Sequence, residues 1–201
     1  MTSPPAIHVE PLFATPVILD RPDAVPIDRG ATMRQVEAAL RQQGRSSAAI
    51  APGPAVQPII DHAVGLANRA TAQTNGAGPI HWHAAVTGHA ADGHHGLPIA
   101  PEYEAFWKAL FVLGDGQGAE ASGRIVLADP RLPAPMMEAA NVRLRLRLDN
   151  PGAIYAPEVS LPAAAGDMVL MPGWLGGRWH PAPGHDRTLL LSITLLAPLS
   201  R

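Results

Sequence analysis

The stretch from Gly166 to Leu196 constrains the fold of this chain more than any other. It reads GDMVLMPGWLGGRWHPAPGHDRTLLLSITLL, a Gly-Asp turn followed by a short apolar run, a polar loop and a longer run of Leu, Ile and Thr. Apolar runs of about 4–8 residues between turn residues are typical of buried strands. Turn, strand, loop and strand in this order predict the closing half of a β-barrel whose mouth is suited to a ligand.

Two amphipathic helices are predicted in the N-terminal part. From about Thr32 to Gln43 apolar residues recur on one face, Thr32 with Gln35 resembles a capping box, and Gly44 ends the pattern. From Pro58 to about Ala72 a proline in the first turn is followed by apolar residues at helical spacing. We expect each helix to pack its apolar face against a core.

Short strands separated by Gly, Pro and Asp are expected in the rest of the chain. We predict an α+β fold, mainly β, with the two helices packed on one side of an antiparallel barrel or sandwich. Residues 44–57 and most of 84–104 are expected to form loops. One domain covers 1–201, with an extended segment and the helices in 1–75 and the barrel in 76–201. The expected strands are Phe13–Leu19, Ile80–Val86, Ala105–Leu113, Arg124–Ala128, Val142–Leu148, Asp167–Met171 and Thr188–Leu196.

Composition excludes several classes of function. The formal net charge is −2, so no general attraction to nucleic acid or to an anionic membrane is expected. The chain has no cysteine, so a metal would be held by His and carboxylate, a donor set that favours iron, manganese or zinc. No signal peptide and no apolar stretch of about 18 residues is present, which predicts a cytoplasmic protein without a membrane span. Exposed barrel edges and the apolar C-terminal strand favour a homodimer.

The segment Val142–Leu148 alternates leucine or valine with Arg143, Arg145 and Arg147. One interpretation is a half-buried strand with a solvated basic face. The other is an anion-binding stripe for a partner or an acidic substrate. Three arginines on one pleat repel one another unless water or counter-charges separate them.

Histidines are the candidates for metal chemistry. His81 and His83 flank Trp82, and residues two apart on a strand face the same side, so both imidazoles could bind one ion. The alternative is a strand that carries two histidines without a metal. His89, His94 and His95 fall in a Gly/Ala/Asp-rich stretch, where exposed loop histidines are expected.

His180 and Arg187 are the candidates near the barrel mouth. His180, between Trp179 and Pro181, is interpreted either as a rim ligand or as a loop histidine packed on tryptophan. Arg187 begins an apolar strand and needs an anion or solvent, because burying it alone is costly. A bidentate carboxylate ligand suits its guanidinium, and a surface salt bridge is the alternative. No nucleophile elbow, P-loop or dinucleotide fingerprint is present.

Four stretches together resemble the small bacterial 2-oxoglutarate/Fe(II)-dependent oxygenases. They are PLFATPV near the start, the strand with Trp82, SGRIVLADPR at 122–131, and GDMVLMPGWL followed by an Arg-led apolar strand. The resemblance implies a double-stranded β-helix (jelly-roll) barrel, an iron held by a His-x-His or His-x-Asp pair and a distal His, and a substrate hydroxylated at the expense of 2-oxoglutarate. Arg187 matches the arginine that binds the far carboxylate of 2-oxoglutarate.

The metal ligands depart from the family pattern. The distal His falls on Gly177, and His180 could replace it only if Arg178 and Trp179 bulged outward. Counted from Trp107, the proximal pair falls near Ala100 and Glu102. Counted from Trp82, it falls near His95 and Leu97. The candidate ligands that remain are His180, His81, His83 and His95, with His94 and Glu102 less favoured.

Two functions follow from the sequence. In the first, the protein is an Fe(II)/2-oxoglutarate-dependent oxygenase with a shifted triad, acting on a small molecule or a peptide side chain. In the second, the barrel is retained and the iron site is lost, which leaves a catalytically inactive jelly-roll binding protein. Metal uptake and 2-oxoglutarate binding distinguish the two.

Overall fold

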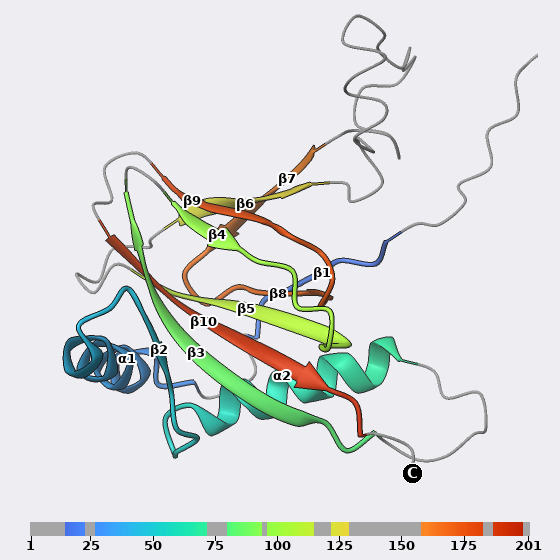
Figure 1. Cartoon of the computed structure of the whole chain (residues 1–201), viewed down its shortest axis with the longest axis horizontal. Helices are drawn as coiled ribbons and strands as arrows, with labels where there is room; N and C mark the ends of the chain where they lie inside the picture. The colour runs from blue at the N-terminus through green and yellow to red at the C-terminus, as the bar shows by residue number, and fades with distance from the viewer. Residues whose placement is uncertain are drawn as a thin grey trace, which may run out of the picture.

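The computed structural model describes residues 15–22, 27–71, 80–93, 96–114, 122–128, 158–182 and 187–198. Its elements alternate between the N-terminal helices and strands that then run to the C-terminal region (Figure 1). In chain order they are β1 (Ile18–Asp20), α1 (Arg29–Gln43), β2 (Ser47–Ala49), α2 (Gln57–Ala70), β3 (His83–Asp92), β4 (Leu97–Ile99), β5 (Trp107–Gly114), β6 (Ser122–Ala128), β7 (Glu158–Ala164), β8 (Met168–Pro172), β9 (Gly177–Pro181) and β10 (Arg187–Leu196).

Within these residues the strands form two antiparallel sheets that face each other. Sheet A has the order β1-β8-β5-β10-β3-β2, and sheet B has the order β4-β9-β6-β7. From β3 to β6, and again from β7 to β10, successive strands alternate between the two sheets. This winding is that of a jelly roll. Both helices cover the face of sheet A that points away from sheet B (Figure 1).

The predicted helix α1 is confirmed, but its N-terminal cap is not the predicted one. Asp28 is the N-cap, and its carboxylate accepts a hydrogen bond from the backbone N–H of Ala31. Thr32 instead donates its hydroxyl to the carbonyl oxygens of Asp28 and Ala55. Gly44 ends the helix in the left-handed conformation, with φ 60°, as a C-terminal glycine commonly does.

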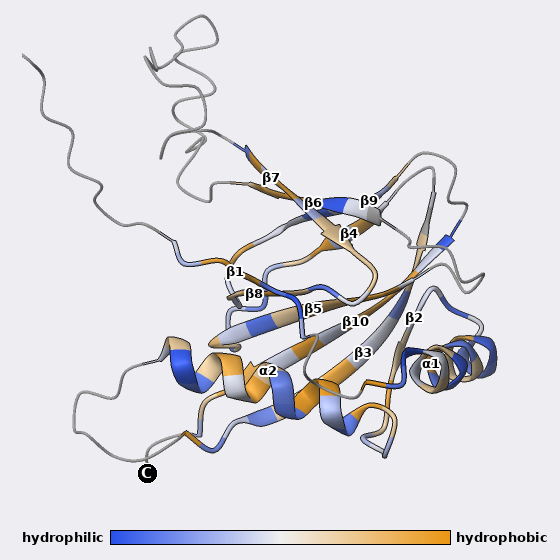
Figure 2. Ribbon diagram, turned by 180° about the vertical axis from the view of Figure 1, so that it is seen from behind, coloured by the Kyte–Doolittle hydropathy of each residue, from blue (hydrophilic) through white to orange (hydrophobic). Residues whose placement is uncertain are grey.

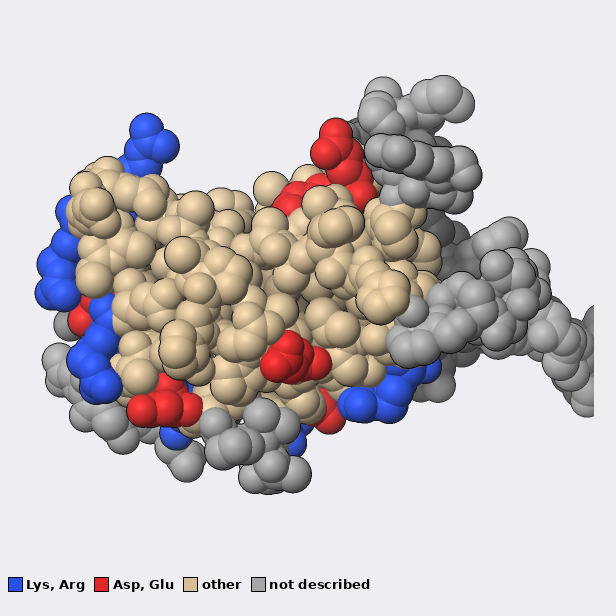
Figure 3. Space-filling model, turned by 90° about the horizontal axis from the view of Figure 1, so that it is seen from below, with Lys and Arg blue, Asp and Glu red and all other residues tan. Residues whose placement is uncertain are grey.

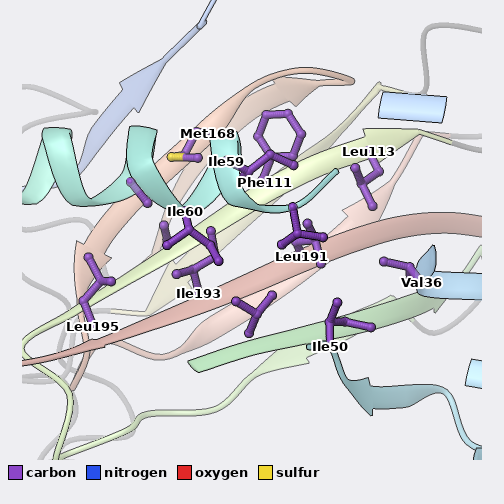
Figure 4. Close-up of a cluster of buried hydrophobic side chains, with 14 of the residues drawn as sticks. Val36, Ile50, Ile59, Ile60, Phe111, Leu113, Met168, Leu191, Ile193 and Leu195 are labelled. Atoms are coloured by element: carbon purple, nitrogen blue, oxygen red, sulfur yellow. The ribbon is translucent and has the colours of Figure 1, made fainter. Parts of the chain in front are cut away.

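Helix α2 lies along sheet A with one apolar face toward it (Figure 2). Ile59 and Ile60 from this helix meet side chains of β5 and β10 in a large buried cluster, the helix-side core (Figure 4). Val36 of α1 reaches the same cluster and would overlap any Cβ placed on Gly88 of β3. The apolar spacing read from the sequence therefore marks the faces that pack on the sheet.

Strand β10 divides its side chains between two cores. Leu189, Leu191, Ile193 and Leu195 belong to the helix-side core, whereas Leu190 belongs to a second cluster between the two sheets. Successive side chains of a strand point to opposite faces, so the alternation assigns every residue of β10 to one side. The second cluster, here the inter-sheet core, holds residues of both sheets.

Several strand predictions needed correction. Strand β3 starts later than expected and runs to Asp92, so the expected loop at 84–104 is largely wrong. Strands β2, β4 and β9 lie in segments expected to be loops; they are short and pair at sheet edges or with β6, so no apolar run marks them. Strand β7 was not predicted. The segment Val142–Leu148 lies outside the described residues.

Charges are unevenly distributed over the helical face. Lys and Arg gather at the end where α1 lies, and most of the face seen from below carries neither acidic nor basic side chains (Figure 3). Among the described helices, none has the length and apolarity needed to cross a membrane.

Candidate functional site

The predicted proximal histidines lie at the end of β3 opposite Arg187. His83 pairs with Leu196, whereas Asp92 at the other end pairs with Arg187. The ten residues of β3 span about 30 Å at the usual rise of a strand. His81 and His83 are both exposed. The structure therefore does not bring this pair toward the other predicted site residues.

His180 lies on the outer face of sheet B. Its neighbour Trp179 is fully buried in the inter-sheet core, so the imidazole of His180 points the other way. Strand β9 pairs with β6 residue by residue from Gly177 to Pro181 without a register shift. The outward bulge that would return His180 to the interior is therefore not formed.

Gly177, to which the resemblance assigns the distal histidine, has no room for a side chain. A Cβ there would overlap the carbonyl oxygen of Val126 and crowd Leu127. Two residues later, the indole of Trp179 occupies the interior, and a Cβ on Gly123 would overlap its ring. Interiors are close-packed, so a histidine ligand does not fit at this part of the barrel.

Arg187 faces helix α1 instead of the interior. Its Nη1 lies 3.6 Å from Glu37 Oε1, and the guanidinium is about half exposed. The next residue on the same face of β10 is Leu189, which packs in the helix-side core. The structure thus does not place Arg187 and His180 around a shared cavity, and the salt-bridge interpretation describes the observed contact. Its role toward 2-oxoglutarate stays a prediction from the resemblance.

His94 and His95 lie outside the described residues, so their assignment as ligands stays a prediction. Within the described ranges no three His, Asp or Glu side chains come together in a way that could hold a metal ion. The described residues by themselves do not fit an iron triad, and no catalytic step is derived through one.

A different set of polar side chains does converge, on the inner face of sheet A. Lys108 Nζ lies 3.0 Å from Glu102 Oε1 and also donates to the carbonyl oxygen of Ala100. Thr194, the cross-strand partner of Lys108, donates its hydroxyl to Glu102 Oε2 at 2.6 Å. The lysine side chain is 2% exposed and the glutamate 42%. The carboxylate that was a candidate metal ligand is therefore bound to an ammonium and a hydroxyl.

His89 lies on the same face, within β3. Its Nδ1 is 2.8 Å from the hydroxyl of Ser47, its cross-strand partner on β2. Burial lowers the pKa of His89 to about 4, while the nearby Glu102 raises it and Lys108 lowers it. At neutral pH the imidazole is uncharged.

Glu102 is ionised under the same conditions. Burial acts to raise the pKa of Glu102, but hydrogen bonds from Thr194 and Lys108, with the lysine's charge, bring it below its ordinary value. The inner face of sheet A thus combines an ion pair, two hydroxyls and a neutral imidazole. Together they can bind a small polar molecule and exchange hydrogen bonds with it.

Sequence reasoning missed most of this cluster. His89 was expected in an exposed loop, which is wrong because β3 continues through it. Lys108 is the one charged residue in the apolar strand β5, and this interruption is the signal that could have found it. Ser192 and Thr194 similarly alternate with the apolar residues of β10.

No family model matches the sequence, and no curated protein matches it. Solved structures do match. The non-heme alpha ketoglutarate dependent carbocyclase SnoK from nogalamycin biosynthesis is 13% identical, with 90% of this chain and 79% of that chain covered and a TM-score of 0.54. HygX from Streptomyces hygroscopicus with iron bound is 15% identical (92% and 83% covered, TM-score 0.54). AviO1 from Streptomyces viridochromogenes Tue57 is 11% identical (93% and 92% covered, TM-score 0.54).

These matches confirm the predicted fold. The chain has the double-stranded β-helix that it shares with non-heme iron and 2-oxoglutarate-dependent enzymes, over about nine tenths of its length. HygX has also been crystallised with nickel and 2-oxoglutarate bound. At this level of identity the likeness establishes the fold, and the chemistry has to be argued from the residues of this chain.

Proposed function

We propose that this protein is an Fe(II)/2-oxoglutarate-dependent oxygenase that hydroxylates a small molecule or a peptide side chain. The observation that carries this proposal is the fold shared with SnoK and HygX across most of the chain. The four sequence stretches that resemble the oxygenases support it independently. Fe(II) and 2-oxoglutarate are the proposed cofactors, since HygX binds iron in one structure and 2-oxoglutarate in another.

The direct test combines metal analysis with turnover. Protein reconstituted anaerobically with Fe(II) is expected to retain stoichiometric metal and to convert 2-oxoglutarate to succinate and carbon dioxide. Retention of metal is compared in single alanine variants of His81, His83, His95 and His180. A ligand is expected to lose metal on substitution without loss of fold, whereas a spectator keeps it. Absence of both metal and turnover in the wild type contradicts the proposal.

A second function is favoured by one specific observation, the filled interior around Trp179. The indole and the crowded Gly177 leave no place for a side chain where the resemblance puts the distal ligand. A jelly-roll protein without iron would bind its ligand through the polar inner face of sheet A and catalyse no oxidation. Ligand binding that persists in metal-free protein, with no 2-oxoglutarate turnover after reconstitution, is the result expected for this function.

A further inference from the structure

The carboxylate of Glu102 is held as a bound organic acid would be held. Oε1 receives the Lys108 ammonium at 3.0 Å, and Oε2 receives the Thr194 hydroxyl at 2.6 Å. Each oxygen has its own donor, and both donors come from strands. We propose that Lys108 and Thr194 form a receptor for a small carboxylic acid, which Glu102 occupies as an internal stand-in.

The two donors are fixed, whereas the acceptor is not. Lys108 and Thr194 are cross-strand partners in the centre of sheet A, where the β5–β10 ladder holds both backbones. Glu102 lies in the connection between β4 and β5 and belongs to no strand. Connections of this kind rearrange more readily than the strands that they join. The receptor therefore persists when the occupant leaves.

The exposures of the pair show which partner is replaceable. Lys108 is 2% exposed and cannot meet water, whereas the Glu102 side chain is 42% exposed and forms the solvent side of the pair. A buried ammonium without a partner is strongly unfavourable, so an anion from solution has to enter when Glu102 departs. A carboxylate from solution restores both hydrogen bonds that Glu102 makes.

The surroundings suit an acid with further polar atoms. Ser192, the residue before Thr194 on the same face of β10, and Thr87, its cross-strand partner on β3, place hydroxyls beside the receptor. His89, on the same face of β3, adds an uncharged imidazole. No second cation of the described residues joins Lys108 there, so one carboxylate is bound through charge and the rest of the acid through hydrogen bonds.

The test is a titration of metal-free protein, kept in chelator, with succinate. An internal carboxylate on a short connection competes at an effective concentration in the millimolar range, so removing it raises the apparent affinity. Glu102→Gln keeps the shape of the side chain and removes its charge. We expect it to bind succinate about tenfold more tightly than wild type, or better. Glu104→Gln, an exposed glutamate two residues away, is the matched control and is expected to behave as wild type.

The site is assigned by a second substitution. Adding Lys108→Met to Glu102→Gln is expected to abolish succinate binding, and adding Thr194→Val is expected to weaken it. Succinamide, which has the same length without charge, is expected not to bind any variant. Glu102→Gln that binds succinate no more tightly than wild type overturns the receptor, as does tight binding that survives Lys108→Met.

The unpaired lysine could prevent Glu102→Gln from folding, and the test then becomes one of rescue. Refolding with succinate is expected to restore the variant, whereas refolding with succinamide is not, and failure of succinate overturns the receptor. Succinate lacks the 2-oxo group that chelates iron, and no metal is present. The result is therefore independent of whether the protein is an oxygenase.

Discussion

The two faces of sheet A differ although the same strands build them. On the face toward α1 and α2, β10 presents Leu189, Leu191, Ile193 and Leu195, all nearly inaccessible to solvent. On the inner face the same strand presents Leu190 under sheet B and then Ser192 and Thr194, which are partly exposed. One face is apolar throughout, and the other changes from apolar to polar along its length.

The difference follows from what covers each face. Two helices lie along the outer face and exclude water from it, so any unpaired polar group there would be costly. Sheet B packs on one part of the inner face through β8, β5 and Leu190, and the part around β3 and β10 stays in reach of solvent. The outer face therefore stabilises the fold, and the inner face has room for a ligand.

The largest effect is expected from breaking the outer face. Leu191→Ala deletes a fully buried side chain and is expected to lower the free energy of unfolding by about 3 kcal/mol. Its neighbour Ser192 faces the inner side, and Ser192→Ala is expected to cost under about 1 kcal/mol. Urea denaturation of both variants measures the contrast. Equal losses would contradict the assignment of the two residues to different faces.

A cost of about 2 kcal/mol is expected for Gly177→Ala, since overpacking forces the backbone of β6 away. Gly53→Ala, where the nearest side-chain atom lies 3.9 Å from the added Cβ, is the control and is expected to be close to neutral. Thermal or urea unfolding measures both. A stable Gly177→Ala would show that β9 can shift, and the interior at Trp179 would then have room for a ligand.

The buried ion pair is expected to respond unequally to loss of either partner. Glu102→Gln strands the ammonium of Lys108 inside the protein, at a cost on the order of 2 kcal/mol, because an uncompensated buried charge remains. Lys108→Met removes the buried charge and leaves a carboxylate that water screens, so a smaller loss is expected. Unfolding at low salt without any organic acid gives the comparison. A larger loss for Lys108→Met would reverse the roles of fixed and replaceable partner.

Acidification is expected to weaken the inner face in two steps. The pKa of His89 falls from 6.5 to about 4 on folding, so the unfolded chain binds a proton first, and stability declines as the pH drops from about 6.5 to about 4. The depressed pKa of Glu102 adds a second loss below its ordinary value of 4.5. We expect about 1–2 kcal/mol from the first step. His89→Gln should remove that step and keep the second; an unchanged pH profile would show that His89 is not buried as described.

The sequence was sufficient for the elements whose periodicity is set by one covered face. Both helices, β5, β8 and β10 carry apolar side chains at the spacing of their contacts, and a four-stretch resemblance supplied the barrel that joins them. Strands such as β4 and β9 could not be predicted because each is stabilised by its neighbours in the sheet and carries no apolar pattern of its own. The inner-face cluster was missed for a related reason. Glu102, Lys108 and Thr194 are far apart in the sequence and meet only when β5 and β10 pair.

The smallest change in stability is expected for Arg187→Ala, and it separates the sequence prediction from the structure. The guanidinium is half exposed and 3.6 Å from Glu37, a surface pair worth under about 0.5 kcal/mol. The resemblance to the oxygenases predicts that this variant loses affinity for 2-oxoglutarate, since Arg187 would bind the far carboxylate. The position on the helix-covered side predicts unchanged affinity for that acid, because β10 separates Arg187 from the inner face. Calorimetric titration of the variant beside Lys108→Met decides which cation receives the carboxylate, and a loss confined to Arg187→Ala would require β10 to turn its first residue inward when the acid binds.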